Sequence, residues 1–233
     1  MGTIAENLAR IQSAKTDIRT AIEAKGVTVP SSATIDTYDD YVSQISGGGG
    51  GGDATTLEKL IDRSITSIDI PSGVTSIGND TFRNCSSLTS VTIPNSVTSI
   101  GGSAFYNCTR LTSIDIPSGV TSIGGETFNG CSSLTSVTIP NSVTSIGGSA
   151  FYNCTRLTSI DIPSGVTSIG INAFNRCLNL TSVRIEATMP PTLGSNGFGN
   201  TNNCPIYVPS GSVDTYKATS GWSTYADRIQ AIP

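Results

Sequence analysis

The chain of 233 residues is weakly charged, with 13 Lys and Arg against 17 Asp and Glu and a formal net charge of -4. It contains no histidine, which removes the commonest general base and the usual partner of a nucleophilic serine or cysteine. The acidic balance argues against a nucleic-acid partner, and no apolar stretch approaches the ~18 residues of a membrane span, so we expect neither.

Residues 1–46 predict a small helical module. A second apolar stripe at helical spacing follows Gly26, which is expected to end the first helix. A core this thin favours oligomerisation over a lone two-helix hairpin, and we expect a homo-oligomer, with a trimer favoured. The first residues, MGTIAENLARIQ, lack the architecture of a signal peptide, so no export by that route is expected. The first helix has the a/d spacing of a coiled coil, with one polar member, at Ile4, Leu8, Ile11, Lys15, Ile18 and Ile22.

Residues 47–52 are all glycine and predict a flexible linker. The run has no Gly-Lys-Ser/Thr ending, so it is not a phosphate loop. The following segment, TTLEKLIDRS, predicts a short helix capped by Thr56, whose Leu57, Leu60 and Ile61 cover the first repeat.

Residues 53–187 contain a repeat with a period of 23 residues, and such a fixed period indicates a solenoid. From Cys85 to Gly124 the chain matches Cys131 to Gly170 in all 40 positions, which indicates duplication of a pair of units. The period is kept by three apolar columns: Cys85, Cys108, Cys131, Cys154 and Cys177; Phe82, Phe105, Phe128, Phe151 and Phe174; Ile70, Ile93, Ile116, Ile139 and Ile162.

Each unit predicts two short extended segments and a turn. The segment Leu88–Ile93 alternates as a strand does, and Pro94 ends it. The segment Val97–Ile100 predicts a second strand, and SAFYNC (Ser103–Cys108) predicts a tight helical turn that buries its Ala, Phe and Cys. One unit buries too little apolar surface to offset the ordering of its residues, so stacking is obligatory.

The unit, written L-x-x-I-x-I-P, V-x-x-I-G and A-F-x-x-C, resembles the BspA-like class of bacterial leucine-rich repeats, and the resemblance covers about residues 57–233. It implies a curved solenoid that acts in bacterial surface adhesion and protein recognition rather than in catalysis. A sixth unit degenerates after Ile185, and residues 188–233 look like a degenerate repeat followed by the family's C-terminal cap. We therefore expect a β-rich leucine-rich-repeat solenoid with short strands and helical turns, joined to a small N-terminal α-helical module.

The candidate binding residues lie on the strands, where the side chains that flank the buried pair face outward. They form a ladder on the face that the family's curvature makes concave: Asp69, Thr92, Asp115, Thr138, Asp161 and Arg184. A serine ladder runs beside it: Ser67, Ser90, Ser113, Ser136, Ser159 and Ser182. This surface either binds a bacterial surface protein or glycan, or only keeps the sheet soluble. Tyr106 and Tyr152, on the opposite side, are candidate exposed aromatic anchors.

No catalytic residue is predicted, and the chain is not expected to be an enzyme. The ladder carboxylates recur every ~10 Å, near the spacing of an inverting glycosidase, but their near-identical surroundings give no acid and base pair. The cysteines have no C-x-x-C spacing, so we expect neither a metal nor another cofactor. Buried, reduced thiols are expected instead.

The N-terminal segment IRTAIEAKGVTVPSSATIDTYDDYVSQI is similar to a small module of tail-fibre and other structural proteins of bacteriophages and prophages. This resemblance implies a virion tail protein, attached to other tail proteins through residues 1–46, whose solenoid recognises a host receptor. The alternative is a bacterial cell-surface adhesin or protein-interaction module of the same repeat class. A third, weaker interpretation is a hydrolase that acts on surface glycans.

Overall fold

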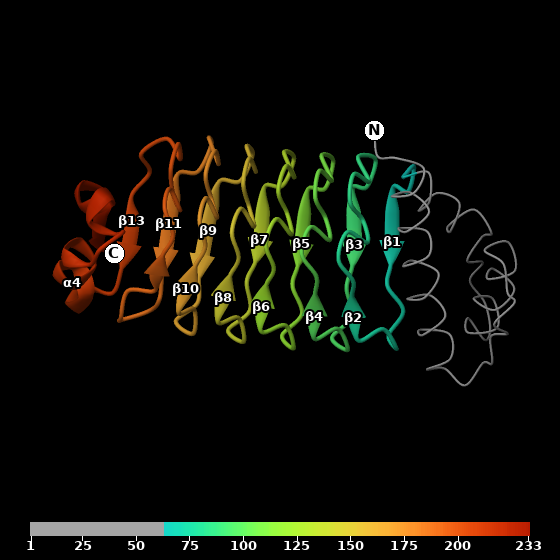
Figure 1. Cartoon of the computed structure of the whole chain (residues 1–233), viewed down its shortest axis with the longest axis horizontal. Coiled ribbons are helices and arrows are strands. Elements are labelled where there is room, and N and C mark those ends of the chain that lie inside the picture. Colours follow the sequence, from blue (N-terminus) through green and yellow to red (C-terminus); the bar gives the residue numbers. More distant parts are fainter. Residues whose placement is uncertain (1–62) are drawn as a thin grey trace, which may run out of the picture. The chain divides into compact units, whose positions relative to one another are not determined.

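The computed structural model describes residues 63–233, which form the stacked rungs of a β-solenoid, each rung being one repeat of the chain (Figure 1). This architecture confirms the predicted leucine-rich-repeat solenoid. The predicted helical module, with its stripe from Ile4 to Ile22, lies outside the described residues. So do the glycine linker and the short helix that Thr56 was expected to cap.

The paired strands of the first row are parallel and in register, as Ser67 is with Ser90 and Ser159 with Ser182. The row divides into three sheets, β1–β3, β5–β7 and β9–β11–β13–β14. Alternate side chains point inward, because the pleat of a strand turns successive side chains to opposite faces. The row consists of β1 (Ser67–Asp69), β3 (Ser90–Thr92), β5 (Ser113–Asp115), β7 (Ser136–Thr138), β9 (Ser159–Ile162), β11 (Ser182–Ile185), β13 (Ile206–Val208) and β14 (Ile229–Ala231).

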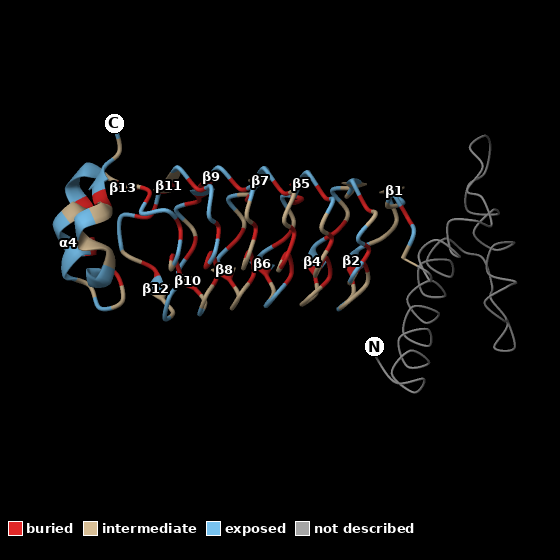
Figure 2. Ribbon diagram, turned by 90° about the horizontal axis from the view of Figure 1, so that it is seen from above, coloured by how far each residue is buried: buried red, intermediate tan, exposed pale blue. Residues whose placement is uncertain are grey.

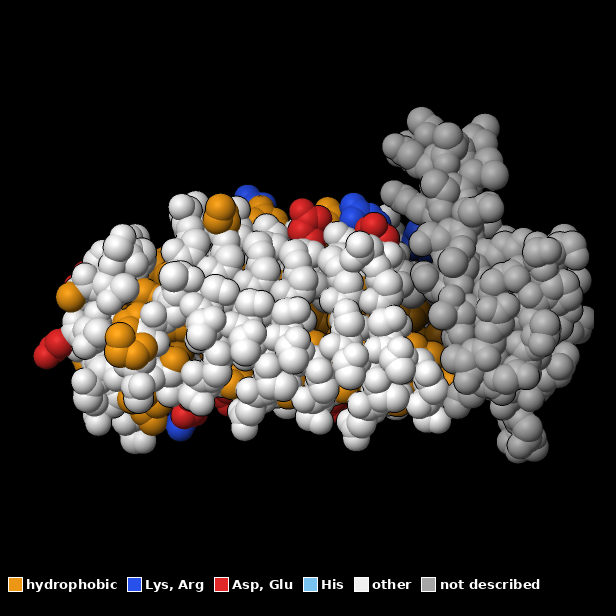
Figure 3. All heavy atoms as spheres, turned by 60° about the horizontal axis from the view of Figure 1, so that its bottom comes forward, with side chains coloured by type: hydrophobic (Ala, Val, Ile, Leu, Met, Phe, Trp, Pro, Cys, Tyr) orange, Lys and Arg blue, Asp and Glu red, His pale blue; other side chains and the backbone are white. Residues whose placement is uncertain are grey.

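A second row of two-residue strands forms one continuous six-stranded parallel sheet. In each strand from β2 to β10 the serine faces outward and the isoleucine is buried. Figure 3 shows the face that carries this row, which consists mainly of backbone and of side chains that are neither charged nor hydrophobic. The strands are β2 (Ser76–Ile77), β4 (Ser99–Ile100), β6 (Ser122–Ile123), β8 (Ser145–Ile146), β10 (Ser168–Ile169) and β12 (Thr192–Leu193).

The third side of each rung is not the helical turn that SAFYNC predicts. It is a series of tight turns in which Tyr106 N–H bonds to the Ser103 carbonyl and Cys108 N–H to the Phe105 carbonyl. Ser103 and Asn107 have φ values of 55° and 56°, in the left-handed region, which no helix residue adopts. This geometry directs alternate N–H groups along the solenoid, so that Phe105 N–H bonds to the Thr127 carbonyl of the next rung at 2.8 Å.

The interior is a set of apolar columns that run along the solenoid. Figure 2 marks buried residues in red on each successive rung. Phe82, Phe105, Phe128, Phe151, Phe174 and Phe198 form one such column, with ring centroids 5.1–5.4 Å apart and interplanar angles of 15° or less. Offset stacking of this kind adds about 0.5–1.5 kcal/mol per pair beyond the burial of area. A rung therefore gains more of its stability from contacts with the neighbouring rungs than from contacts within itself.

Glycine allows the rungs to approach closely where the chain leaves the second row. A Cβ atom added to Gly147 would lie 2.6 Å from the backbone of Gly124 and Gly125 in the preceding rung. At the neighbouring Gly148 an added Cβ would meet nothing closer than 3.5 Å. The spacing between these two rungs thus depends on Gly147 and not on Gly148.

The degenerate sixth unit still completes a rung. Thr192 of β12 pairs with Ser168, so one extra residue has been inserted within the 23-residue step. Phe198 stacks on Phe174 at 5.2 Å with parallel rings, which restores the column. The repeat therefore continues structurally beyond residue 187, where its sequence pattern ends.

The C-terminal cap consists of η1 (Ser210–Ser212), α4 (Val213–Ala218) and η2 (Ser223–Arg228), followed by β14. Trp222 is fully buried against Phe198, with ring centroids 5.8 Å apart, and its indole N–H bonds to the Pro191 carbonyl. The Tyr216 hydroxyl bonds to the Ala187 carbonyl. These contacts close the apolar columns, because an uncapped solenoid end would expose its core. Within residues 63–233, no helix is long and apolar enough to cross a membrane.

Candidate ligand-recognition surface

The outward ladder lies on the first row of strands as predicted. Asp69 pairs in register with Thr92, Asp115 with Thr138, and Asp161 with Arg184. All six side chains point away from the core; five are exposed, and Arg184 is half-buried. Neighbouring rungs are linked here by side chains as well as by backbone, since Thr138 donates a hydrogen bond to the Asp115 carboxylate at 3.2 Å.

The ladder extends further than the sequence repeat indicates. Tyr207 of β13 pairs with Arg184, and Gln230 of β14 pairs with Tyr207, which adds two members on the C-terminal side. Tyr207 follows Arg184 by 23 residues, so the period is kept in this row of strands. The relation is hard to see in the sequence because residues inserted in the degenerate unit shift the Phe and Cys columns. The added pair changes the surface from hydroxyls and carboxylates to an aromatic ring and an amide.

A groove of about 720 Å³ lies over β7 and β9, open to solvent, at the centre of this ladder. Thr138 and Asp161 of the ladder line it, together with Ser136 and Ser159 of the serine ladder. Glu186 lies at its end and forms an ion pair with Arg184, with an N···O distance of 2.6 Å. The groove therefore offers hydroxyl groups, one carboxylate without an ion pair among the described residues, and one neutralised pair.

The two tyrosines, Tyr106 and Tyr152, are half-buried side chains of the turn side and so less exposed than expected. Their role as aromatic anchors stays a prediction. The guanidinium of Arg83 lies over the Tyr106 ring, 4.0 Å from its centroid, and covers part of it. Arg83 is fixed there by an ion pair with Asp80 at 3.0 Å. A ligand would have to displace this arrangement to stack on Tyr106. The positions equivalent to Tyr152 in its neighbouring rungs are asparagines, Asn129 and Asn175.

The cysteines lie in the core, as expected, and all six are buried. The Cys131 thiol donates a hydrogen bond to the carbonyl of Phe105 at 3.1 Å, and Cys154 and Cys177 repeat this bond one and two rungs further on. Burial raises the pKa of the Cys131 and Cys177 thiols to about 12. Such thiols stay protonated at neutral pH and do not act as nucleophiles. No group of His, Cys, Asp or Glu within residues 63–233 could hold a metal ion.

Rungs that place a short strand, a second extended segment and a Phe-Cys turn in each 23 residues define a leucine-rich repeat. The model of the BspA type leucine-rich repeat region matches residues 61–181 and 144–220, in 6 copies. The chain therefore belongs to the BspA-type leucine-rich repeat family.

One solved structure agrees with this assignment, and a second is similar in sequence. A leucine-rich repeat protein of T. pallidum is 29% identical, with a TM-score of 0.54, over 61% of this chain and 68% of that protein. A leucine-rich repeat protein from Bacteroides ovatus is 28% identical, with a TM-score of 0.47, over 61% of this chain and 47% of that protein. The chain thus spans less than half of the second protein. No curated protein matches the chain.

Proposed function

We propose that the chain is a non-enzymatic binding protein of a bacterial cell surface that recognises a partner protein through the first row of strands. The observation that carries this proposal is the ladder from Asp69 to Gln230, whose centre forms the groove at Asp161. Membership of the BspA type, a protein-interaction repeat, supports it. The family resemblance to bacterial surface proteins supports the proposed location.

The groove provides the chemistry of a polar protein contact. Ser136, Ser159 and Thr138 can donate or accept hydrogen bonds, and Asp161 can accept them from a Lys or Arg of a partner. Each rung contributes a weak contact, and neighbouring rungs repeat it, so affinity is expected to grow with the number of rungs engaged. The same surface can instead hold a glycan, which protease treatment of the target cells distinguishes.

The test compares two variants that carry the same added charge on different faces. Thr138→Lys with Ser159→Lys changes the groove, and Thr98→Lys with Thr144→Lys changes the second row of strands. Binding of the labelled full chain to bacterial and epithelial cells should fall at least ~10-fold for the groove variant and stay near the original for the other. Equal binding by both variants would refute the proposal. Binding that survives protease treatment of the target cells would identify a glycan, and not a protein, as the ligand.

The proposed location has its own test. An antibody against the cap should label intact producing cells without permeabilisation. Labelling only after permeabilisation would contradict a surface location, whatever the binding assay shows. A cleavage assay on surface polysaccharides addresses the hydrolase interpretation separately, and we expect no product.

The tail-fibre interpretation remains a prediction that rests on the residue pattern of the first 46 residues, which the family match does not cover. Its test is the mass in solution of the full chain against that of a chain starting at Asp53. A trimer that becomes a monomer on truncation would support a fibre with tail-protein partners. Monomers in both cases would contradict the coiled coil of Ile4, Leu8, Ile11, Lys15, Ile18 and Ile22.

A further inference from the structure

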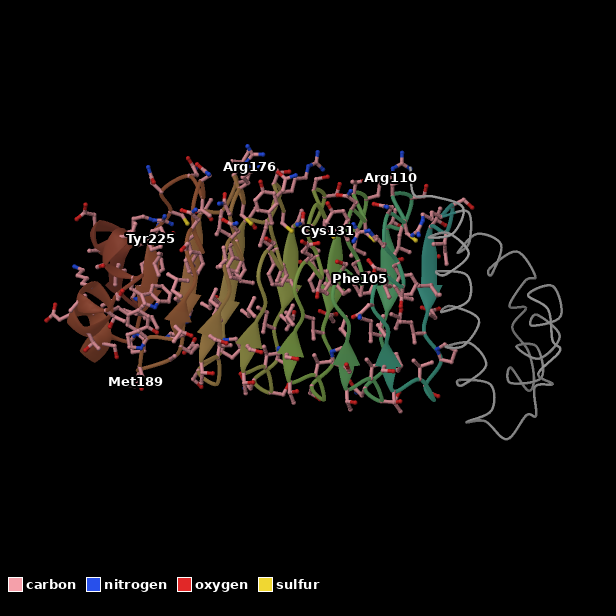
Figure 4. The ribbon with its side chains drawn as sticks, viewed as in Figure 1. Phe105, Arg110, Cys131, Arg176, Met189 and Tyr225 are labelled. Atoms are coloured by element: carbon pink, nitrogen blue, oxygen red, sulfur yellow. The ribbon has the colours of Figure 1, made fainter. Side chains whose placement is uncertain are left out.

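A second surface lies along the edge where each rung passes from its turn side into the first row of strands. We define this arginine edge as residues 107–110, 130–133, 153–156 and 176–179. Arg110, Arg156 and Arg176 are exposed there, and none of them forms an ion pair or a side-chain hydrogen bond within residues 63–233. Figure 4 shows Arg110 and Arg176 projecting from the same edge.

The charge on this edge is segregated from the rest of the solenoid. Residues 63–233 contain eight Lys and Arg and eight Asp and Glu, so this part of the chain is neutral as a whole. The four segments of the arginine edge contain no Asp or Glu. The acidic residues lie on the strand ladder and its end, at the start of the turn side, or in the cap: Asp69, Asp115, Asp161 and Glu186; Asp80 and Glu126; Asp214 and Asp227.

The arginines also have a regular spacing. Arg110 and Arg156 occupy equivalent positions 46 residues apart in segments of identical sequence, which places them two rungs, or about 10 Å, apart. Between them lies Ser133, whose hydroxyl makes no hydrogen bond among the described residues. Arg176 follows one rung after Arg156, beside Leu178, which is 52% exposed.

We propose that the arginine edge binds a linear anionic polysaccharide that runs along the solenoid. A polymer with acidic groups in every disaccharide meets Arg110 and Arg156 in the same way, because the two sites are copies. The guanidinium groups pair with carboxylate or sulfate, Ser133 bonds to sugar hydroxyls, and the exposed face of Leu178 contacts sugar C–H groups.

Two other anionic partners fit less well. A nucleic acid has a phosphate for every ~3.4 Å of each strand and needs aromatic rings for its bases when it is single-stranded, and the arginine edge holds neither charges at that spacing nor an aromatic residue. The carboxylates of an acidic protein do not in general recur at the separation of about 10 Å between Arg110 and Arg156. The edge is separate from the groove at Asp161, so the proposal stands independently of the proposed function.

The test uses the full chain and heparin as the probe, with retention on immobilised heparin and titration calorimetry at low and high salt. The edge variant carries Arg110→Gln, Arg156→Gln and Arg176→Gln. The control carries Arg83→Gln and Lys217→Gln, which removes positive charge away from both the arginine edge and the ladder. The three edge arginines and Lys217 are exposed, and Arg83 is half-buried in an ion pair with Asp80, so circular dichroism should show both variants folded.

We expect the unmodified chain to bind heparin with a salt-dependent affinity. The edge variant should lose affinity at least ~10-fold, and the control should remain within ~2-fold, because charge position and not net charge decides binding. Absence of binding at low salt, or equal loss in both variants, would overturn the proposal. Equally tight binding of poly-glutamate or of duplex DNA would also overturn it, since the edge would then attract any polyanion.

Discussion

The indole nitrogen of Trp222 lies 2.7 Å from the carbonyl oxygen of Pro191, and the same ring covers Phe198, the last member of the stacked phenylalanine column. One side chain of the cap therefore satisfies a backbone carbonyl of the final rung and ends the column. Tyr216 packs edge-on against Trp222 from α4, with ring centroids 5.0 Å apart, and fixes its position.

Replacing Trp222 with alanine should destabilise the solenoid by about 3–5 kcal/mol, because it removes a large buried ring and leaves the Pro191 carbonyl without its donor. Urea unfolding of the full chain, followed by circular dichroism, measures this loss. Met189→Ala is the control, since Met189 is 72% exposed and should change stability by less than ~0.5 kcal/mol. A loss below ~1 kcal/mol at Trp222 would show that the cap does not hold the stack.

The Gly-Gly pair between the second row and the turn side provides a sharp test of rung spacing. Gly147→Ala should cost about 1–3 kcal/mol, since its Cβ would overlap the backbone of Gly124 and Gly125. Gly148→Ala, one residue further on, should be nearly neutral because its Cβ meets only ordinary contacts. Thermal unfolding of the two variants checks the difference, and equal melting temperatures would contradict the close approach of the rungs.

The buried thiols predict a loss of stability in alkaline solution. Burial raises the pKa of Cys131 to about 12 from its ordinary value of 9.0, so between these values the unfolded chain releases a proton that the folded chain retains. Stability is therefore fully present below pH ~9 and falls above it, by about 1.4 kcal/mol per pH unit for each such thiol. Urea unfolding between pH 8 and pH 10.5 measures the slope.

Cys131→Ala with Cys177→Ala is the matched control for this slope. The double variant is less stable at every pH, because it leaves two small cavities, but its stability should fall less steeply above pH ~9. The same slope in both proteins would show that these thiols do not retain their protons on folding.

Removing residues 111–156 should give a shorter protein that still folds. The deletion joins Arg110 to Leu157, which restores the sequence that follows each of these arginines in the original chain. Two rungs are lost and every remaining contact between rungs is kept, so stability should fall by the interface terms of those rungs alone. The m-value, which is the slope of the unfolding free energy against denaturant concentration, should decrease because less surface area is exposed on unfolding.

Deletion of residues 111–145 is the out-of-register control. It removes 35 residues, which is not a multiple of the 23-residue period, and brings strand residues against turn residues. We expect this variant to lose the far-ultraviolet circular dichroism spectrum of the folded solenoid. If both deletions folded equally well, the register of the columns would not determine the fold.

The period of the sequence predicted the columns of Phe and Cys and the outward orientation of Asp69 through Arg184, because these depend only on which residues recur. It did not predict the turn geometry. SAFYNC has the composition of a helical turn, but Ser103 and Asn107 adopt left-handed φ values to aim their neighbours' N–H groups at the next rung. The signal was present at the equivalent positions Asn84, Gly130 and Asn153, residues that tolerate this conformation, although Arg176 adopts it as well.

Two features of the candidate surfaces depend on contacts that the period does not reveal. Tyr106 is partly covered because Arg83 replaces a tyrosine or asparagine at the equivalent position one rung earlier. Arg176 lies at a different position of the repeat from Arg110 and Arg156, so their common edge becomes evident only once the rungs are stacked.

The rung-to-rung hydrogen bonds described above have a mechanical consequence. They run along the solenoid from rung to rung, so tension applied between its ends would load the interfaces in series with the same force, and the weakest interface would separate first. Each release would lengthen the chain by up to about 80 Å, the extended length of 23 residues. A protein tethered at one end and attached to a partner at the other would then yield in steps, and would extend under a pull instead of releasing its hold.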